Sequence, residues 1–339
     1  MILRAIPSPR HLGMLAGATV SAPIVALPTW LRRAVPGEQA VAAQGLEDIA
    51  IAAGAAIGAL DAVVRRQERW AGAWGRRLAL AAASITAKQA GRVEDDAALR
   101  DAVLLTRPGD DAGPAGRMYL GWCRLTARPT EDLLTEANLG AVLEEFGHAR
   151  DDEAVGELVD ELRKVGASAG TVGMLTGAFT AAERHGFGRV FGSWLADALL
   201  AQRLGWSHAV PLLGTNAAFG ISPGRSRRTA TAQASTNIVD EAGWAKALLG
   251  AQARAALRAI DLSAELGRRA DRLLAVAPKL RAKAANTVIE KLLSDDAIVA
   301  SENIAGMSDR GLRRLFDRLL ELGAVRELSG RPTFRIYGL

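Results

Sequence analysis

The sequence predicts a mainly α-helical fold, in which a multi-helical body is followed by a small C-terminal winged helix-turn-helix with one β-hairpin. Three observations predict it. Alanine, leucine and arginine recur at helical spacing, aromatic residues make up only 5% of the 339 residues, and strand-like alternation is confined to the final stretch, GAVRELSGRPTFRIYGL. Small apolar side chains suit closely packed helices better than sheets.

The length of the chain exceeds what a single core usually supports, so we predict three parts. Residues 1–40 are punctuated by proline and glycine and form an N-terminal arm. Residues 41–277 form the helical body, and residues 278–339 form the winged-helix domain.

The body begins with a helix after Gly45, because apolar residues from Leu46 to Val64 follow the i, i+3, i+4, i+7 rule. A second helix covers 68–90, with Trp70 and Trp74 on one stripe. Further helices are predicted near 95–105, 131–146, 150–163, 168–184, 187–203 and 235–260. Glycines recur every three or four residues from 166 to 177. This stretch is either one helix that a neighbour approaches closely or a broken one.

The C-terminal domain is predicted from caps and periodicity. A first helix begins at Pro278, Ser301 caps a very short second helix, and Ser308 caps the third. That third helix buries Leu312, Leu315, Phe316 and Leu319, and it ends at Gly323. A hairpin follows, with strands at 325–328 and 333–337; alternation places Phe334 and Ile336 on one face.

Arginines on the third helix predict a surface for double-stranded DNA. On a helical wheel Arg310 and Arg314 lie opposite the buried stripe, with Arg313 and Arg318 on its flanks. In winged helices the first half of the third helix enters the major groove. From the hairpin, Arg331 and Arg335 are expected to hold the phosphate backbone. The net charge of +5 and the isoelectric point near 9.8 are compatible with that partner.

Acidic residues leave a second interpretation open. Asp309, Asp317 and Glu321 dilute the basic face, and winged helices also dock onto proteins. The alternative is therefore an interaction protein whose C-terminal domain contacts a protein partner or its own body. The sequence does not decide the oligomeric state.

The loop 107–117 supports a third and weaker interpretation, an enzyme with its site in the body. Its glycines offer backbone N–H groups to a phosphate, whereas Asp110 and Asp111 repel a phosphate and suit a divalent cation. Arg107 and Arg117 flank the loop. Proline and glycine at this density more often mark a simple connector between helices.

Other patterns favour a protein without catalysis, cofactor or metal. Glu145 and His148 form one E-x-x-H, but di-iron bundles need a second copy, and the sequence has none. Walker, nucleophile-elbow and Rossmann motifs are missing. Cys123 is the only cysteine, which excludes an internal disulfide and favours the cytoplasm. The uncharged stretches at 49–60 and 165–182 are too short or too polar to span a membrane.

Several stretches carry a resemblance to a known family. RRQERWAGAW, LTRPGDDAGPAGR, LGWSHAVPLL and GRPTFRIYGL resemble an uncharacterised bacterial family filed as domain of unknown function 1403, over about residues 10–339. That resemblance implies no catalytic residue. The tail from Leu312 onward is similar to winged-helix ends of bacterial regulators and of some Fic-type proteins. The segment 301–305 is shorter than the usual second helix, and the Fic signature HPFxxGNGR is absent.

Overall fold

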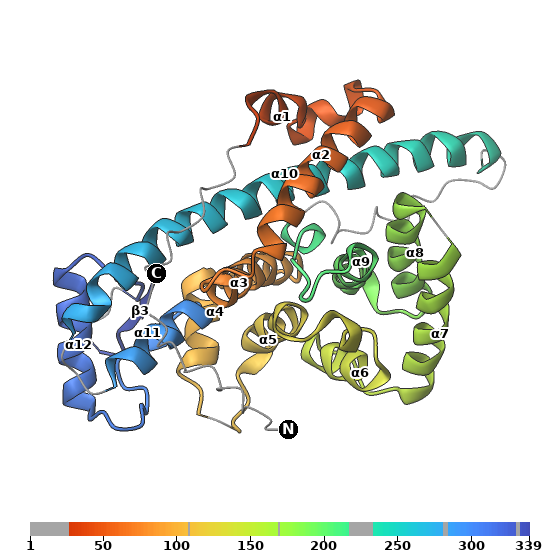
Figure 1. Ribbon diagram of the computed structural model, residues 1–339. Helices are drawn as coiled ribbons and strands as arrows, with labels where there is room; N and C mark the ends of the chain where they lie inside the picture. Colours follow the sequence, from red (N-terminus) through yellow and green to blue (C-terminus); the bar gives the residue numbers. More distant parts are fainter. Residues whose placement is uncertain (1–26, 108, 169, 217–232, 281–283, 330–332) are drawn as a thin grey trace, which may run out of the picture.

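Helices follow one another along almost all of the described chain, as the sequence predicts (Figure 1). The computed structural model describes residues 27–107, 109–168, 170–216, 233–280, 284–329 and 333–339, without the side chains of 168 and 233–241. Most of the predicted N-terminal arm and the predicted hairpin turn lie outside these residues. Within them the fold is mainly α, with one small antiparallel sheet near the C-terminus.

The body consists of ten α-helices within the described residues. They are α1 Thr29–Ala34, α2 Leu46–Arg65, α3 Ala71–Gln89, α4 Asp96–Leu104, α5 Gly113–Ala127, α6 Glu136–Glu145, α7 Asp152–Ser168, α8 Thr171–Arg184, α9 Gly188–Leu204 and α10 Gln233–Val276. Short 3-10 helices lie between them: η1 Glu38–Ala43, η2 Thr130–Asp132, η3 Leu213–Thr215 and η5 Ala277–Lys279.

Helix α1 lies within residues 1–40, which were predicted as an arm outside the body, and helices α5 and α10 also differ from the prediction. Helix α5 was expected to be partly loop, yet Pro114 occupies a first-turn position, where its missing N–H and fixed φ suit a helix start. Helix α10 continues sixteen residues past the predicted end, because Leu266, Ala270 and Leu273 extend its buried stripe.

The glycine-rich stretch is broken rather than continuous. Helix α7 ends at Ser168, and Gly170 is the N-cap of α8. Gly177 nevertheless serves a close approach, because a Cβ on it would lie 2.7 Å from Val165 Cγ1. Both alternatives that the sequence left open therefore describe part of this region.

Alanine-rich faces set the packing of the body. Helix α2 lies against α10, α3 against α5, and α8 against α9 (Figure 1). At the first of these contacts α2 buries Ala52, Ala53 and Ala56, and α10 buries several alanines of its own. Small side chains bring helix axes close and leave little void volume.

Two tryptophans join α3 to α10. Trp74 Nε1 donates a 2.9 Å hydrogen bond to the carbonyl oxygen of Ala259. The ring of Trp70, the residue before α3, covers Gly267, where a Cβ would lie 2.9 Å from Trp70 Cζ2. The predicted tryptophan stripe is thus buried, and it faces the longest described helix.

A buried carboxylate holds the η3 turn inside the body. Asp197, in the buried centre of α9, accepts backbone N–H groups from Leu212, Leu213 and Gly214 at 2.8, 3.0 and 3.2 Å. Gly214 has no space for a side chain, because a Cβ would lie 2.0 Å from Trp122 Cη2. This turn is therefore fixed by hydrogen bonds on one side and by an indole ring on the other.

Residues 285–339 form what we call the C-terminal unit. Its elements are α11 Ala285–Ser294, β1 Ile298–Val299, α12 Asp309–Glu321, β2 Arg326–Glu327 and β3 Ile336–Gly338. The strands pair antiparallel in the order β1-β3-β2. In the register, Ile298 faces Tyr337 and Glu327 also faces Tyr337 from the other edge.

The C-terminal unit differs from the prediction at three points. Pro278 lies within the 3-10 helix η5, which begins at Ala277, and α11 starts at Ala285. The predicted short helix after Ser301 is a pair of turns, because the Ala300 N–H still donates to Arg335 at 2.8 Å and keeps the chain on the sheet. The sequence prediction also missed strand β1.

Both faces of the small sheet are covered. Tyr337 stacks on Phe316 of α12, with ring centroids 4.2 Å apart and planes 11° from parallel. On the opposite face Ile336 packs with Ala297 and Val299, and Leu104 of α4 lies against them. The sheet therefore lies between its own helix and the body.

Charged groups fasten the C-terminal unit to the body. Asp296, whose side chain is 4% exposed, accepts hydrogen bonds from Arg77 of α3 and Arg100 of α4. Farther out, Arg269 of α10 donates to the carbonyl oxygen of Leu339 at 2.9 Å. One continuous apolar core includes residues of the body and of the C-terminal unit.

Candidate nucleic-acid interface

Helix α12 presents one apolar and one charged face. Ser308 Oγ accepts the Gly311 N–H at 3.2 Å and caps the helix as predicted. The predicted stripe is buried, and it consists of Leu312, Leu315, Phe316 and Leu319. The opposite face is exposed to solvent, so its arginines are accessible from outside the molecule.

The predicted arginines share this exposed surface. Arg310, Arg313, Arg314 and Arg318 are all exposed. Arg318 pairs with Glu321 at 2.9 Å. Among the described residues, the guanidinium groups of the other three take part in no hydrogen bond or ion pair. Three positive charges in the first half of α12 are therefore available to an anionic partner.

The hairpin brings a further cation to the same side. Arg335 is exposed, and its Nε lies 3.8 Å from a carboxylate oxygen of Glu327. A hydrogen bond with Tyr337 and the charge of Glu327 raise the pKa of Arg335 above its ordinary value. Arg331, the other predicted hairpin contact, lies outside the described residues.

A cavity of about 480 Å³ lies between α12 and the hairpin. Arg313 and Asp317 line it from α12, and Phe334, Arg335 and Tyr337 line it from the hairpin. The predicted residues Arg313 and Arg335 therefore meet at one concave surface, whereas Arg310 and Arg314 do not line it.

Phe334 was expected on the same face of the second strand as Ile336, but Ile336 is buried and Phe334 is exposed. Its φ is +56°, in the left-handed region that non-glycine residues seldom adopt, and 64% of the residue is exposed. Strand β3 begins only at Ile336, so the predicted alternation does not reach Phe334. Strain of this kind costs about 1–3 kcal/mol and concentrates at binding sites.

The predicted ligand loop is largely engaged in local structure. Asp111 Oδ1 accepts the Gly113 N–H at 2.9 Å and lies 3.7 Å from Arg117 Nε. Arg107 and Asp110 are both exposed. The backbone N–H of Asp110 donates a 3.0 Å hydrogen bond to the carbonyl oxygen of Arg107. The second half of the loop is the first turn of α5. These contacts are typical of the start of a helix. The binding of a ligand by this loop remains a prediction.

The two residues of the E-x-x-H pair contact different neighbours. Glu145 ends α6 and pairs with Arg124 at 2.7 Å, while His148 lies beyond the helix and edge-on to Phe187. Burial raises the pKa of Glu145 and lowers that of His148. In the described part of the chain, His, Cys, Asp and Glu side chains nowhere gather in a group of three that suits a metal ion.

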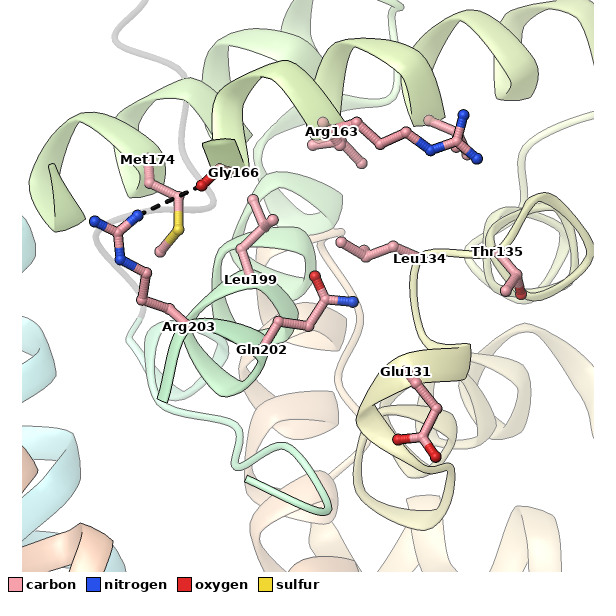
Figure 2. A pocket seen from close by; sticks show the side chains of 11 residues that line it. Glu131, Leu134, Thr135, Arg163, Gly166, Met174, Leu199, Gln202 and Arg203 are labelled. Carbon is pink, nitrogen blue, oxygen red and sulfur yellow. Dashed lines mark hydrogen bonds between the residues drawn. The ribbon is translucent and has the colours of Figure 1, made fainter. Parts of the chain in front are cut away.

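A second cavity, of about 470 Å³, lies between α7, α8, α9 and η2 (Figure 2). Its apolar part includes Met174 and Leu199. Arg203 donates to the carbonyl oxygen of Gly166 at 3.4 Å, and Arg163 pairs with Asp160 at 2.7 Å. Both arginines at this cavity are thus already engaged by neighbours.

Comparisons with known proteins agree with the resemblance in the sequence. The model of a family described as protein of unknown function (DUF1403) matches residues 18–339. No curated protein and no solved structure matches the chain. None of the helices in the described residues is long and apolar enough to cross a bilayer.

Proposed function

The chain belongs to the DUF1403 family, and from this premise we propose that it is a cytoplasmic, non-enzymatic regulatory protein that binds double-stranded DNA through its C-terminal unit. One observation carries the proposal. Arg310, Arg313 and Arg314 are exposed and have no partner among the described residues, and Arg313 lines one cavity with Arg335 and the exposed ring of Phe334.

The order of elements supports a winged helix. Helix, strand, helix and hairpin follow one another, with the first strand on the far edge of the hairpin, in the order β1-β3-β2. In such a domain α12 is the recognition helix and its N-terminal half enters the major groove. Two turns replace the second helix, and Ser308 caps the start of α12.

The positive end of the helix dipole and the arginines both favour an anion at the basic face. Arg310 lies in the first turn of α12, near the positive end of the helix dipole. This position is mildly unfavourable for a cation in the free protein. A DNA phosphate between Arg310 and the first-turn N–H groups offsets that cost.

The hairpin supplies the second contact. Arg335 reaches a phosphate next to the groove that α12 occupies. Phe334 presents an apolar ring that stacks on a sugar or partly unstacks a base step, as wedges do in minor grooves. Binding of DNA thereby uses the exposed aromatic residue that the free protein holds in a strained conformation.

Charge-matched variants of the full chain test the proposal. The first carries Arg310→Gln, Arg313→Gln and Arg314→Gln, and the control carries Arg150→Gln, Arg163→Gln and Arg272→Gln. Both sets remove three exposed positive charges. Binding to a mixed-sequence duplex is measured by fluorescence anisotropy at several salt concentrations.

We expect wild-type binding that weakens steeply with salt. The α12 variant reduces the slope of log K against log salt by about 0.9 for each DNA phosphate that it no longer neutralises, and the control changes the slope little. Equal losses in both variants, or a wild-type chain that does not bind DNA, would contradict the proposal.

A protein partner is the second candidate function. Asp309 and Asp317 alternate with the arginines on the same helix, and the cavity beside Asp317 holds an exposed aromatic ring. Such a mixed surface also fits a protein that carries both charges. A wild-type chain that does not bind DNA would favour this interpretation.

A further inference from the structure

A cavity of about 330 Å³ lies where the C-terminal unit meets the body. Among the residues that line it are Gln67, Trp74, Arg76, His208, Val210 and Asp295. They come from the start of α3 and the residues before it, the segment after α9, and the end of α11. Its volume is at the lower end of the range typical of small-molecule sites.

Arg76 is the cation of this cavity. Its guanidinium is partly buried and within hydrogen-bonding reach of the Cys123 thiol, which Tyr119 also approaches. Burial raises the pKa of Cys123 above its ordinary value, so the thiol is neutral near pH 7. Arg76 forms no ion pair within 4.0 Å with any of the residues that the structure describes, its acidic neighbour Asp295 included. Its charge is therefore not neutralised by direct contact.

Asp295 provides the opposite charge in the lining of the same cavity. It follows the last residue of α11, and its backbone N–H donates to the carbonyl oxygen of Lys291 at 2.8 Å, which fixes its position. The carboxylate contributes a favourable charge interaction to Arg76, and the two side chains form no ion pair within 4.0 Å. A separated guanidinium and carboxylate leave space for a group that bridges them.

The wall near Gln67 is strained. Gln67 has φ +48°, and Gln67 and Phe334 are the two non-glycine residues with left-handed backbone in the described part of the chain. Its side-chain amide donates to Ser207 Oγ at 2.7 Å and to the carbonyl oxygen of Val64 at 3.2 Å. These bonds hold an unfavourable conformation at the cavity wall, a pattern common at binding sites.

We propose that this cavity binds a small zwitterion of the α-amino-acid class. The carboxylate of the ligand pairs with the fork of Arg76, and its ammonium group pairs with Asp295. Its side chain lies against Trp74, Leu78 and Val210, which line the cavity. A dianion such as phosphate is disfavoured because Asp295 repels it.

The position of the cavity gives the ligand a mechanical role. Arg76 belongs to the body, and Asp295 immediately precedes Asp296, the residue that fastens the C-terminal unit to Arg77 and Arg100. A ligand that bridges the two walls adds to the same junction. Binding here does not depend on DNA binding, since the cavity and the arginine face of α12 are different surfaces.

Binding to the full chain tests the inference. Each of the twenty standard L-amino acids is screened by thermal shift, and any that bind are measured by calorimetry. For each of these, the analogue without the amino group and the analogue without the carboxyl group are measured as well. The variants are Arg76→Lys, Arg76→Gln and Asp295→Asn, with Lys88→Gln as an exposed control on the same helix.

We expect at least one amino acid to bind and both of its analogues to bind about tenfold more weakly or worse. Arg76→Gln and Asp295→Asn weaken binding by a similar factor, Arg76→Lys keeps part of it, and Lys88→Gln leaves it unchanged. Three results would overturn the inference: no binding by the folded wild-type chain, equal binding of the deaminated analogue, or binding that survives both charge-removing variants.

Discussion

Asp197 shows how one buried acid organises a turn that carries little sequence signal. Three backbone N–H groups converge on its carboxylate, yet complete burial raises its pKa to about 7 from an ordinary value of 3.8. The hydrogen bonds favour the charged form, and the loss of water opposes it. Desolvation is the larger effect, so the folded chain keeps a proton on this group in mildly acidic solution.

This shift predicts the direction of pH dependence. Between about pH 4 and pH 7 the folded chain holds one more proton at Asp197 than the unfolded chain, so the free energy of unfolding falls as pH rises. Urea unfolding at pH 5 and pH 7 measures the difference. Asp197→Asn, which does not titrate, is expected to lose part of this slope; an identical slope in both proteins would contradict the assignment.

Phe334 predicts a trade between stability and binding. Asparagine tolerates the left-handed region better than phenylalanine, so Phe334→Asn is expected to raise the free energy of unfolding by about 1 kcal/mol. Removal of the exposed ring is expected to weaken DNA binding at the same time. Thermal unfolding and anisotropy on one preparation test both effects, and a variant less stable than the wild type would refute the strain argument.

Among elements, the junction between α3, α4 and the start of β1 holds a largely buried cluster of charged side chains. Asp296→Asn leaves Arg77 and Arg100 mostly buried without a counter-charge, which costs about 3–5 kcal/mol. Thermal unfolding measures the loss. Glu321→Gln, which breaks the exposed pair with Arg318, serves as the control and is expected to change stability by less than about 1 kcal/mol.

Hydrogen exchange locates the effect of Asp296→Asn. Amides of the C-terminal unit are expected to exchange faster than those of α8 and α9, because the broken contact lies at its junction with the body. Uniform acceleration over the whole chain would mean that the junction and the body unfold together.

Element by element, the sequence predicts helices where periodicity and caps agree. Helix α12, with Ser308 and its leucine stripe, follows the prediction closely. Helix α5 was missed because glycines made its start resemble a loop. In the structure Gly116 and Gly121 serve close approach: a Cβ on Gly121 would lie 2.9 Å from Phe146, a residue outside α5. Local sequence cannot reveal a neighbour that packs from another element.

The candidate site also has one part that the local sequence predicts and one part that it does not. Arginine exposure on α12 follows from a helical wheel, and that part of the prediction rests on local periodicity. The strained Phe334 depends on how the hairpin meets β1, and the cavity at Arg76 depends on contacts among α3, α5 and α11. Such long-range contacts have no periodic signature in one sequence.

At the scale of the whole molecule, one apolar core joins the body to the C-terminal unit. The Asp296 cluster, the Arg269 contact to Leu339 and the apolar contact at Leu104 act at separate points of this junction. The division of the chain into three parts remains a prediction. The proposed DNA-binding face lies on α12, and the proposed ligand cavity lies at the junction itself. Both proposed sites therefore involve the C-terminal unit that these contacts hold to the body.

Helix α10 has a consequence for how the ends of the protein move. At 1.5 Å per residue its 44 residues span about 66 Å, from the neighbourhood of α8 to that of α11 (Figure 1). If a helix of this length is rigid, a tilt at one end moves the other end as well. Spin labels at Ala242→Cys and Arg272→Cys should report one narrow separation of about 45 Å, since the native Cys123 is buried and escapes labelling. Two populations of label-to-label distance would mean that α10 bends.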